Sequence, residues 1–333
     1  MDLFFSFIIP VYNRPDEIRE LLDSLLEQTY QNPYEVVIVE DGSQNRSEEV
    51  ARSFQKKLQI SYYFKENSGP GDSRNYGMRK AKGNYFIILD SDCLLPPTYL
   101  DSASKALVDH YVDCFGGPDT AHHTFSTTQK AINYAMTAFI STGGIRGNKK
   151  VAQQFQPRSF NMGISKEAFE KTGGFGKIHP GEDPDLSIRL WGLGFNTRLI
   201  PEAFVYHKRR VDFNKFYTQV KKFGMVRPIL NSWHPKTAKL TYWFPIFFII
   251  GLIVSIFLAI VQIPWFLFFY LLYFVVVLID SWYKNKKLGI ALLSLWAVII
   301  QFTGYGLGFF KSTFLLTFSK KKPQELFPFL FFK

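Results

Sequence analysis

The sequence predicts an α/β domain built on a mostly parallel sheet, followed by a helical region that crosses a membrane. Short apolar runs alternate with helix-like segments through the first half of the 333-residue chain, which is typical of a sheet covered by helices on both faces. After Lys239 no charged residue appears until Asp280, and a second uncharged stretch covers residues 288–310. These stretches suit membrane helices, because a hydrocarbon core about 30 Å thick needs roughly 20 apolar residues.

The first domain contains four strand-like segments, at residues 4–11, 34–39, 59–64 and 85–89. Pro15 opens the first helix, since proline and acids favour a first helical turn. The apolar start of the chain is short and lacks a small-residue cleavage site, so we interpret it as a strand and not as a signal peptide.

Polar residues follow three of these strands at the point where each one ends. They are Tyr12 and Asn13, then Asp41, then Asp90 and Asp92. In sheets of this kind, ligands bind beyond the carboxyl ends of the strands. Carboxylate oxygens suit Mg²⁺ or Mn²⁺, usually shared with a phosphate. The pattern therefore predicts a site for a nucleotide diphosphate and a divalent metal.

Further helices are expected after this part of the chain. Residues 182–193 read as a helix, and residues 212–224 alternate apolar and basic side chains at helical spacing. The second helix is interpreted as interfacial, with an ordinary helix packed on the domain as the alternative. The predicted domains are a catalytic domain at 1–211, an interfacial helix or linker at 212–235, and a membrane region at 236–333 with helices near 240–260, 264–283 and 288–310.

The end of the membrane region has two interpretations. A third full span places the lysines at 320–322 outside the cell, whereas Gly304, Gly306 and Gly308 are also compatible with a bent or re-entrant segment. Lysines at 284–287 favour a cytoplasmic return after two spans.

The net charge of +11 indicates contact with a membrane and not with nucleic acid. Many of the cations flank the apolar segments, where they favour anionic lipid and the cytoplasmic side. The basic run at 208–210 is interpreted as binding phosphate or facing lipid. Only two cysteines occur, Cys93 and Cys114, which fits a reducing compartment. We therefore expect a multi-pass protein of the cell inner membrane with a cytoplasmic catalytic domain.

Six motifs in order carry a resemblance to a known family. The chain resembles the family 2 glycosyltransferases, which have the GT-A fold, a Rossmann-like nucleotide-sugar-binding domain with a mixed central sheet. The membrane tail is similar to that of bacterial members that build exopolysaccharide, such as succinoglycan, or lipid-linked glycans. The motifs cover about the first 210 residues and are Phe7-Ile-Ile-Pro-Val-Tyr-Asn-Arg14, Val39-Glu-Asp-Gly-Ser43, Gly69-Pro-Gly-Asp-Ser-Arg-Asn75, Gly83-Asn-Tyr-Phe-Ile-Ile-Leu-Asp-Ser-Asp92, Gly173-Gly-Phe175 and Gly181-Glu-Asp-Pro-Asp185.

The resemblance implies roles for the residues of these motifs. Tyr12 and Asp41 would contact the nucleotide base, and Arg74 would lie near the diphosphate, where a planar cation binds in a bidentate manner. Asp92 would be the main metal ligand. The full set implied for the nucleotide sugar is Pro10, Tyr12, Asn13, Asp41, Arg74 and Asp90, and the set for the metal, Mn²⁺ or Mg²⁺, is Asp92, Asp90 and His207.

Sugar transfer also needs a base that removes the proton of the acceptor hydroxyl. The resemblance implies Asp183 as this base, with Glu182 as the second candidate, and inversion at the anomeric carbon.

The motif of the processive synthases is absent from this sequence. No Gln-x-x-Arg-Trp sequence occurs, and since processive synthases of the family carry that motif, single-sugar transfer is expected. Glu40 stands where the family commonly has Asp, a change that we expect to be tolerated.

The predicted function is metal-dependent transfer of one sugar from a nucleotide-diphospho-sugar to a lipid-linked saccharide at the cytoplasmic membrane face, in polysaccharide or glycolipid biosynthesis. Transfer onto polyprenyl phosphate is a close alternative. A catalytically silent glycan-binding or assembly protein is another, although retained acids at 41, 90, 92 and 183 argue against it. A nucleotidyltransferase fits the Glu-Asp helix less well.

Overall fold

A computed structural model describes residues 2–120, 125–143, 155–207 and 212–332. Residues 2–120, 155–207 and 331–332 form one compact unit, and residues 125–143 and 212–330 form a second. The sequence predicts one uninterrupted domain up to residue 211, whereas residues 125–143 pack with the C-terminal helices. The basic run at 208–210 lies outside the described residues.

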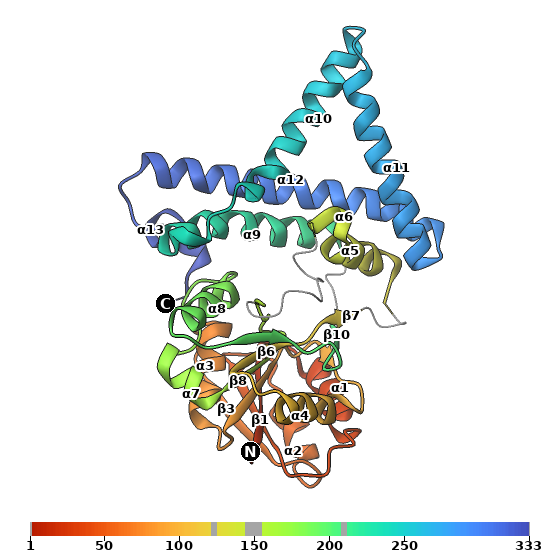
Figure 1. Cartoon of the computed structure of the whole chain (residues 1–333). Coiled ribbons are helices and arrows are strands. Elements are labelled where there is room, and N and C mark those ends of the chain that lie inside the picture. The colour runs from red at the N-terminus through yellow and green to blue at the C-terminus, as the bar shows by residue number, and fades with distance from the viewer. Residues whose placement is uncertain (1, 121–124, 144–154, 208–211, 333) are drawn as a thin grey trace. The chain divides into compact units, whose positions relative to one another are not determined.

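The first unit is an α/β domain (Figure 1). Its strands are β1 (Phe5–Val11), β2 (Glu35–Asp41), β3 (Ile60–Lys65), β4 (Tyr85–Leu89), β5 (Cys93–Leu94), β6 (Cys114–Gly116), β7 (Asp119–Thr120), β8 (Asn161–Ser165), β9 (Thr197–Leu199) and β10 (Val205–His207). Its helices are α1 (Pro15–Leu26), α2 (Glu48–Phe54), α3 (Pro70–Lys80), α4 (Tyr99–Asp109), α7 (Lys166–Thr172) and α8 (Glu182–Gly192).

The main sheet of this unit is mixed, with strand order β3-β2-β1-β4-β8-β6-β9. The first four strands of that order are parallel, and β8 runs antiparallel to both of its neighbours. The predicted GT-A-like domain with a mixed central sheet is thus confirmed. Because β1, β2 and β4 run in the same direction, their carboxyl ends meet at one edge, where the sequence predicts the site.

Apolar cores on both faces of the sheet hold these strand ends in place. Phe7 and Ile9 of β1 face a core completed by α1, α2 and α4, and Ile8 faces a second core completed by α3, α7 and α8. The alternation follows from the two-residue period of a strand. All three side chains are fully buried, so β1 is packed on both faces.

A small second sheet, β5-β10-β7, brings distant segments together next to this edge. β5 starts directly after Asp92, and β10 pairs with it in antiparallel register, with His207 opposite Cys93. Asp119 of β7 pairs with Val205 of β10. The pairing therefore places His207 and Asp119 near the acidic motif.

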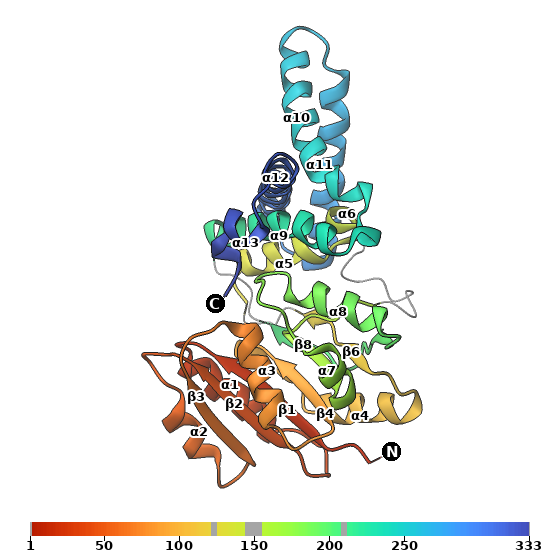
Figure 2. The same ribbon diagram turned by 90° about the vertical axis from the view of Figure 1, so that its left-hand side faces the viewer.

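The second unit is helical. Its elements are α5 (Thr127–Thr137), α6 (Phe139–Thr142), α9 (Phe213–Trp233), η1 (Pro235–Thr237), η2 (Leu240–Trp243), α10 (Phe244–Ile260), α11 (Trp265–Asn285), α12 (Leu288–Phe318), α13 (Pro323–Leu326) and η3 (Pro328–Leu330). Within the described residues, three helical segments are long and apolar enough to cross a membrane: Leu240–Ile260, Trp265–Asn285 and Leu288–Phe318. In Figures 1 and 2, α10 and α11 form a hairpin whose open end meets α12.

The glycines at 304, 306 and 308 do not interrupt α12, which is continuous from Leu288 to Phe318. They are instead points of close helix approach. A Cβ at Gly304 would collide with Val220 of α9, and a Cβ at Gly308 would collide with the carbonyl oxygen of Lys221. Gly224 of α9 faces the backbone of α12 in return. Small residues four apart allow two backbones to approach closely, as in membrane helix pairs.

Helix α9 is longer than the amphipathic segment predicted at 212–224, and part of its apolar face is already covered. Phe216 is fully buried and Val220 is nearly so, in a core that includes residues of α5 and α12. These two side chains therefore pack inside the helical unit, and not on the α/β domain as the alternative interpretation expects.

The contact between α9 and α12 can be tested at Gly308. Gly308→Ala should lower the stability of the protein by about 1–3 kcal/mol, because the added methyl group meets a backbone carbonyl that cannot move aside. Gly289→Ala in the same helix is the matched control, since a Cβ there meets nothing within 4 Å. It should leave stability unchanged or raise it by up to about 1 kcal/mol. Thermal unfolding of the detergent-solubilised chain measures both, and equal midpoints would contradict the proposed packing.

Candidate functional site

The end of β1 is joined to the loop after β2 by Asn13. Its backbone N–H donates to Ser43 Oγ at 2.7 Å, and its side-chain oxygen accepts from two backbone N–H groups of that loop. Asn13 has a φ of 56°, a left-handed value that Asn tolerates better than most residues. Tyr12 precedes it and is 54% exposed. Pro10 lies within β1, beside Val39 of β2. The turn thus presents an accessible aromatic ring next to the end of β2.

Asp41, at the end of β2, is buried and strongly hydrogen-bonded. It accepts from Lys65 Nζ at 2.6 Å and from the backbone N–H groups of Ser68 and Gly69 at 2.9 and 3.0 Å. An ionised carboxylate offers about four acceptor positions, so one is left for a ligand N–H. Lys65 was not singled out from the sequence, although it too stands at the carboxyl end of a strand.

Glu40, which stands beside Asp41, has a structural role in this loop. Its buried carboxylate accepts from the Ser43 hydroxyl, from Ser47 N at 2.8 Å and from the Tyr62 hydroxyl at 3.1 Å. The longer side chain thereby holds the loop after β2 against the start of α2. Because Glu40 fixes the loop that follows Asp41, it helps to hold the end of β2 in place.

Arg74 of α3 is a buried cation that bridges two acids. One guanidinium nitrogen donates to Asp90 Oδ1 at 2.8 Å and another to Glu182 Oε1 at 3.1 Å, while the Arg74 side chain is only 3% exposed. Burial by itself lowers the pKa of Arg74, but the charges of Asp90 and Glu182 outweigh this and raise the pKa further. The bridge connects the end of β4 with the start of α8.

Glu182 is held by a second basic group, His179. The imidazole Nδ1 lies 2.9 Å from Glu182 Oε1, the oxygen that also accepts from Arg74. Burial raises the pKa of Glu182, but His179 and Arg74 overcome this and lower the pKa to about 2. Glu182 raises the pKa of His179 in return, against the opposing effect of burial. Glu182 is therefore an ionised member of an ion-pair network.

Asp183, the next residue, has the opposite electrostatic environment. Its burial and the negative charge of Glu182 raise its pKa to about 6. Within the described part of the chain, the buried Asp183 Oδ1 has no hydrogen-bond partner. Helix α8 thus begins with two adjacent carboxyl groups. Glu182 is kept ionised, whereas Asp183 has a raised pKa and an acceptor atom, Oδ1, without a hydrogen bond to a described residue.

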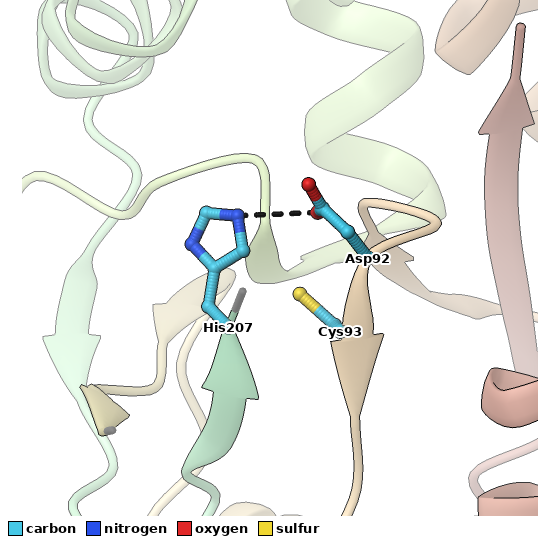
Figure 3. A group of neighbouring side chains, drawn as sticks. All are labelled: Asp92, Cys93 and His207. Atoms are coloured by element: carbon cyan, nitrogen blue, oxygen red, sulfur yellow. Dashed lines mark ion pairs between the residues drawn. The ribbon is translucent and has the colours of Figure 1, made fainter. Parts of the chain in front are cut away.

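Asp92, His207 and Cys93 form a cluster from two segments (Figure 3). His207 Nε2 lies 3.2 Å from Asp92 Oδ1, and the candidate ligand atoms of all three side chains lie within 4.8 Å of one another. The Cys93 thiol donates to the Phe160 carbonyl oxygen at 3.3 Å. Phe160 also stacks on the His207 ring, with centroids 4.7 Å apart, which fixes the plane of the imidazole.

The donor set of this cluster fits a divalent cation. A carboxylate oxygen and an imidazole nitrogen are ordinary ligands for Mn²⁺ and its neighbours. His207 Nδ1 lies 3.9 Å from Asp119 Oδ2, so a carboxylate is near the second ring nitrogen, as at many metal-bound histidines. Arg14 lies 3.6 Å from Asp92 Oδ2 and partly balances its charge. Asp90 faces Arg74 and is only indirectly connected to this group.

The predicted site residues thus fall into three connected groups. Asn13 and Asp41 shape the ends of β1 and β2, Arg74 joins Asp90 to the Glu-Asp helix, and Asp92 meets His207. Sequence reasoning missed Lys65, His179 and Arg14. The first two could have been found from their positions, one at a strand end and one three residues before Glu182.

Comparison with known proteins gives a family match. The profile of the family described as Glycosyl transferase family 2 matches residues 6–173, about half of the chain. This segment includes the strand ends that carry Asp41, Asp90 and Asp92. It includes α5 and α6 of the helical unit but stops short of the Glu-Asp helix and of the three long apolar helices.

Curated relatives match over parts of their length. An uncharacterised glycosyltransferase of Rickettsia typhi is 45% identical over 96 residues, which cover 29% of each chain. Chondroitin synthase of Escherichia coli is 29% identical over 235 residues, covering 61% of this chain and 34% of the synthase. The matches therefore span about a third or less of these two relatives.

A solved structure resembles nearly the whole chain in fold. The mannosyltransferase PcManGT of Pyrobaculum calidifontis, in complex with GDP-Man and Mn²⁺, superposes with a TM-score of 0.59 at 17% identity, covering 96% of this chain and 89% of that one. At this identity the likeness concerns the fold alone. The family profile over residues 6–173, with the ordered motifs around the strand ends, leads to one conclusion: this chain belongs to glycosyltransferase family 2.

Proposed function

We propose that this chain is an inverting, metal-dependent glycosyltransferase that moves one sugar from a nucleotide-diphospho-sugar to a lipid-linked saccharide at the cytoplasmic face of the membrane. The observation that carries the proposal is the Arg74 bridge. It ties Asp90, at the predicted donor edge, to Glu182, next to the predicted base. Donor-side and base-side residues therefore belong to one site, as direct transfer between two substrates requires.

The donor is proposed to bind along the strand ends. Tyr12 offers an exposed ring for stacking on the base, and Asp41 keeps one acceptor position for a base N–H while Lys65 holds its carboxylate in place. The matched mannosyltransferase structure, which contains GDP-Man, supports a nucleotide sugar as the donor class. The predicted contact of Arg74 with the diphosphate remains part of the proposal, although its guanidinium already pairs with two acids.

The proposed base is Asp183 and not Glu182. A general base works best when its pKa lies near the working pH, and the raised pKa of Asp183 meets this condition. Glu182 is paired with Arg74 and His179, and its lowered pKa makes it a weak base. The free Oδ1 of Asp183 would accept the proton of the acceptor hydroxyl. The hydroxyl oxygen of the acceptor would at the same time attack the anomeric carbon of the donor sugar, and the nucleoside diphosphate would leave. A single displacement of this kind inverts the configuration there.

Asp92 and His207, with Asp90 nearby, are proposed to hold Mn²⁺ or Mg²⁺. When bound, the cation would supply positive charge that neutralises the departing nucleoside diphosphate. The chain's own residues prepare this position: Phe160 orients the His207 ring and Arg14 restrains Asp92.

The lipid-linked acceptor is inferred from the helical unit. Three segments long and apolar enough to span a membrane, flanked by lysines, support membrane attachment in the inner membrane with a cytoplasmic catalytic unit. Attachment keeps the site near lipid headgroups, where a polyprenyl-linked saccharide is found. Membrane lipids are therefore proposed partners in addition to the two substrates.

The function is tested with purified chain, Mn²⁺ and a panel of common nucleotide sugars, by measuring released nucleoside diphosphate. Hydrolysis or transfer from at least one donor is expected. If no donor is hydrolysed and no nucleoside diphosphate binds in a Mn²⁺-dependent manner, the chain is a binding or assembly protein and the proposal is wrong.

Asp183→Asn should reduce the turnover number on the active donor by about 10²–10⁴-fold, because the base is lost while the shape of the side chain is kept. Glu167→Gln on the exposed surface of α7 is a control that should leave turnover unchanged. Considerable activity in the Asp183 variant would favour a polyprenyl phosphate acceptor, which already carries negative charge and needs little base assistance.

The pH dependence of kcat/KM should show an acid limb near pH 6. Asp183 acts only when ionised, and its raised pKa means that activity falls as the pH drops through that value. Glu182→Gln removes the negative charge that raises this pKa, so any residual activity should have its acid limb at lower pH. A limb near pH 4 in the unaltered enzyme, the ordinary value for Asp, would contradict the assignment.

His207→Gln should weaken Mn²⁺ binding by at least about 10–100-fold, because loss of a hydrogen-bond partner behind a metal ligand already costs that much. Titration of the purified chain with Mn²⁺, followed by electron paramagnetic resonance of the free ion, measures this without a reaction. Asp16→Asn, at an exposed acid of α1, is the matched control and should bind Mn²⁺ like the unaltered chain. If the unaltered chain and both variants bind Mn²⁺ with equal affinity, His207 is not a ligand of the metal.

A further inference from the structure

The described chain returns to the first unit after its helices. Residues 331–332 follow η3 directly and belong to the α/β unit. Phe331 forms an isolated antiparallel bridge with Ile178, and the Phe332 N–H donates to the Lys177 carbonyl oxygen at 3.0 Å. The segment is therefore attached by backbone hydrogen bonding to the loop that leads into α8.

The Phe332 side chain contacts a second loop of the same unit. Its ring lies directly over Gly69, so closely that a Cβ at this glycine would collide with it. Gly69 also has a φ of +93°, which favours glycine independently of the contact. On the other side, the ring centroid lies 5.9 Å from that of His179. Phe332 thus contacts both the start of α3 and the loop before α8, beside a cavity of about 140 Å³ that both segments line.

Both contacts of Phe332 hold residues of the site. The backbone N–H of Gly69 donates to Asp41, the acceptor proposed for the nucleotide base. His179 pairs with Glu182, whose charge raises the pKa of the proposed base. Further along α3, the Asn75 side chain is hydrogen-bonded to the backbone of Phe175, so that end of the helix already has a link of its own to the same loop.

We propose that Phe332 is a positioning residue for catalysis, acting through Gly69 and His179. Its ring sets the distance between the loop that holds Asp41 and the loop that holds Glu182, so that the donor and the base are positioned together. The catalytic part of this inference rests on the proposed function, whereas the packing part does not. Loss of the ring should loosen both loops and should affect both donor affinity and turnover.

The test compares Phe332→Ala with Phe329→Ala in the full chain in lipid nanodiscs. Phe329 is 56% exposed and lies three residues earlier, so it controls for loss of an aromatic ring near the same end of the chain. Hydrogen exchange is followed in peptides covering 66–72 and 175–182. Exchange should become at least fivefold faster in both peptides in the Phe332 variant and should not change in the Phe329 variant. Unchanged exchange in either peptide overturns the proposal.

Activity gives the second readout. The affinity for UDP and for GDP, each with Mn²⁺, and the kcat and KM on the active donor are measured on the same samples. Phe332→Ala should weaken nucleoside diphosphate binding and lower kcat, each by at least fivefold, and Phe332→Leu should restore most of both because it keeps the bulk over Gly69. An effect on KM with kcat unchanged contradicts a role on the base side.

The two proposals fail separately. If exchange increases in both loops of Phe332→Ala but the unaltered chain neither binds a nucleoside diphosphate nor uses a donor, Phe332 positions these loops and the proposed function is wrong. If Phe332→Ala does not fold, the Leu variant carries the test, with an expected partial increase in exchange at both loops.

Discussion

The site depends on the pairing of one buried cation. The Arg74 side chain is only 3% exposed, and a buried charge that loses a partner costs about 3–5 kcal/mol. Its two partners come from different elements, since Asp90 follows β4 and Glu182 opens α8. Because the guanidinium must keep both acids within hydrogen-bonding distance, α3, β4 and α8 are fixed at one point. The two halves of the site are therefore joined by a requirement for charge balance and not by backbone pairing alone.

The same pairing separates the roles of two neighbouring carboxyl groups. Glu182 is stabilised in its ionised form by Arg74 and His179, and this charge makes ionisation of Asp183 harder. A group that serves only as an ion-pair partner thus raises the pKa of the group next to it towards neutrality. In the sequence only the family resemblance ranks Asp183 before Glu182, because the physical difference comes from His179 and from a helix about a hundred residues earlier.

Local rules predicted the parts of the fold that depend on short segments. Apolar runs and the parallel-sheet rule placed Asp41 and Asp90 at one edge, and the structure agrees because β1, β2 and β4 are parallel neighbours. These local rules could not predict pairing between segments that are far apart in the sequence. His207 comes close to Asp92 only because β10, a strand of three residues, pairs with β5. The glycines of α12 were ambiguous for a similar reason. A glycine permits both a bend and a close contact, and only the partner helix decides between them.

The chain passes between its two units next to residues of the proposed site. The first passage to the helical unit follows Asp119 within four residues, the second follows His207 within two, and the return occurs at Phe331. His207 belongs to the proposed metal cluster and Asp119 lies beside it, whereas Phe331 precedes the ring that contacts Gly69 and His179. The segments that precede and follow the helical unit along the chain therefore carry residues from both sides of the proposed site.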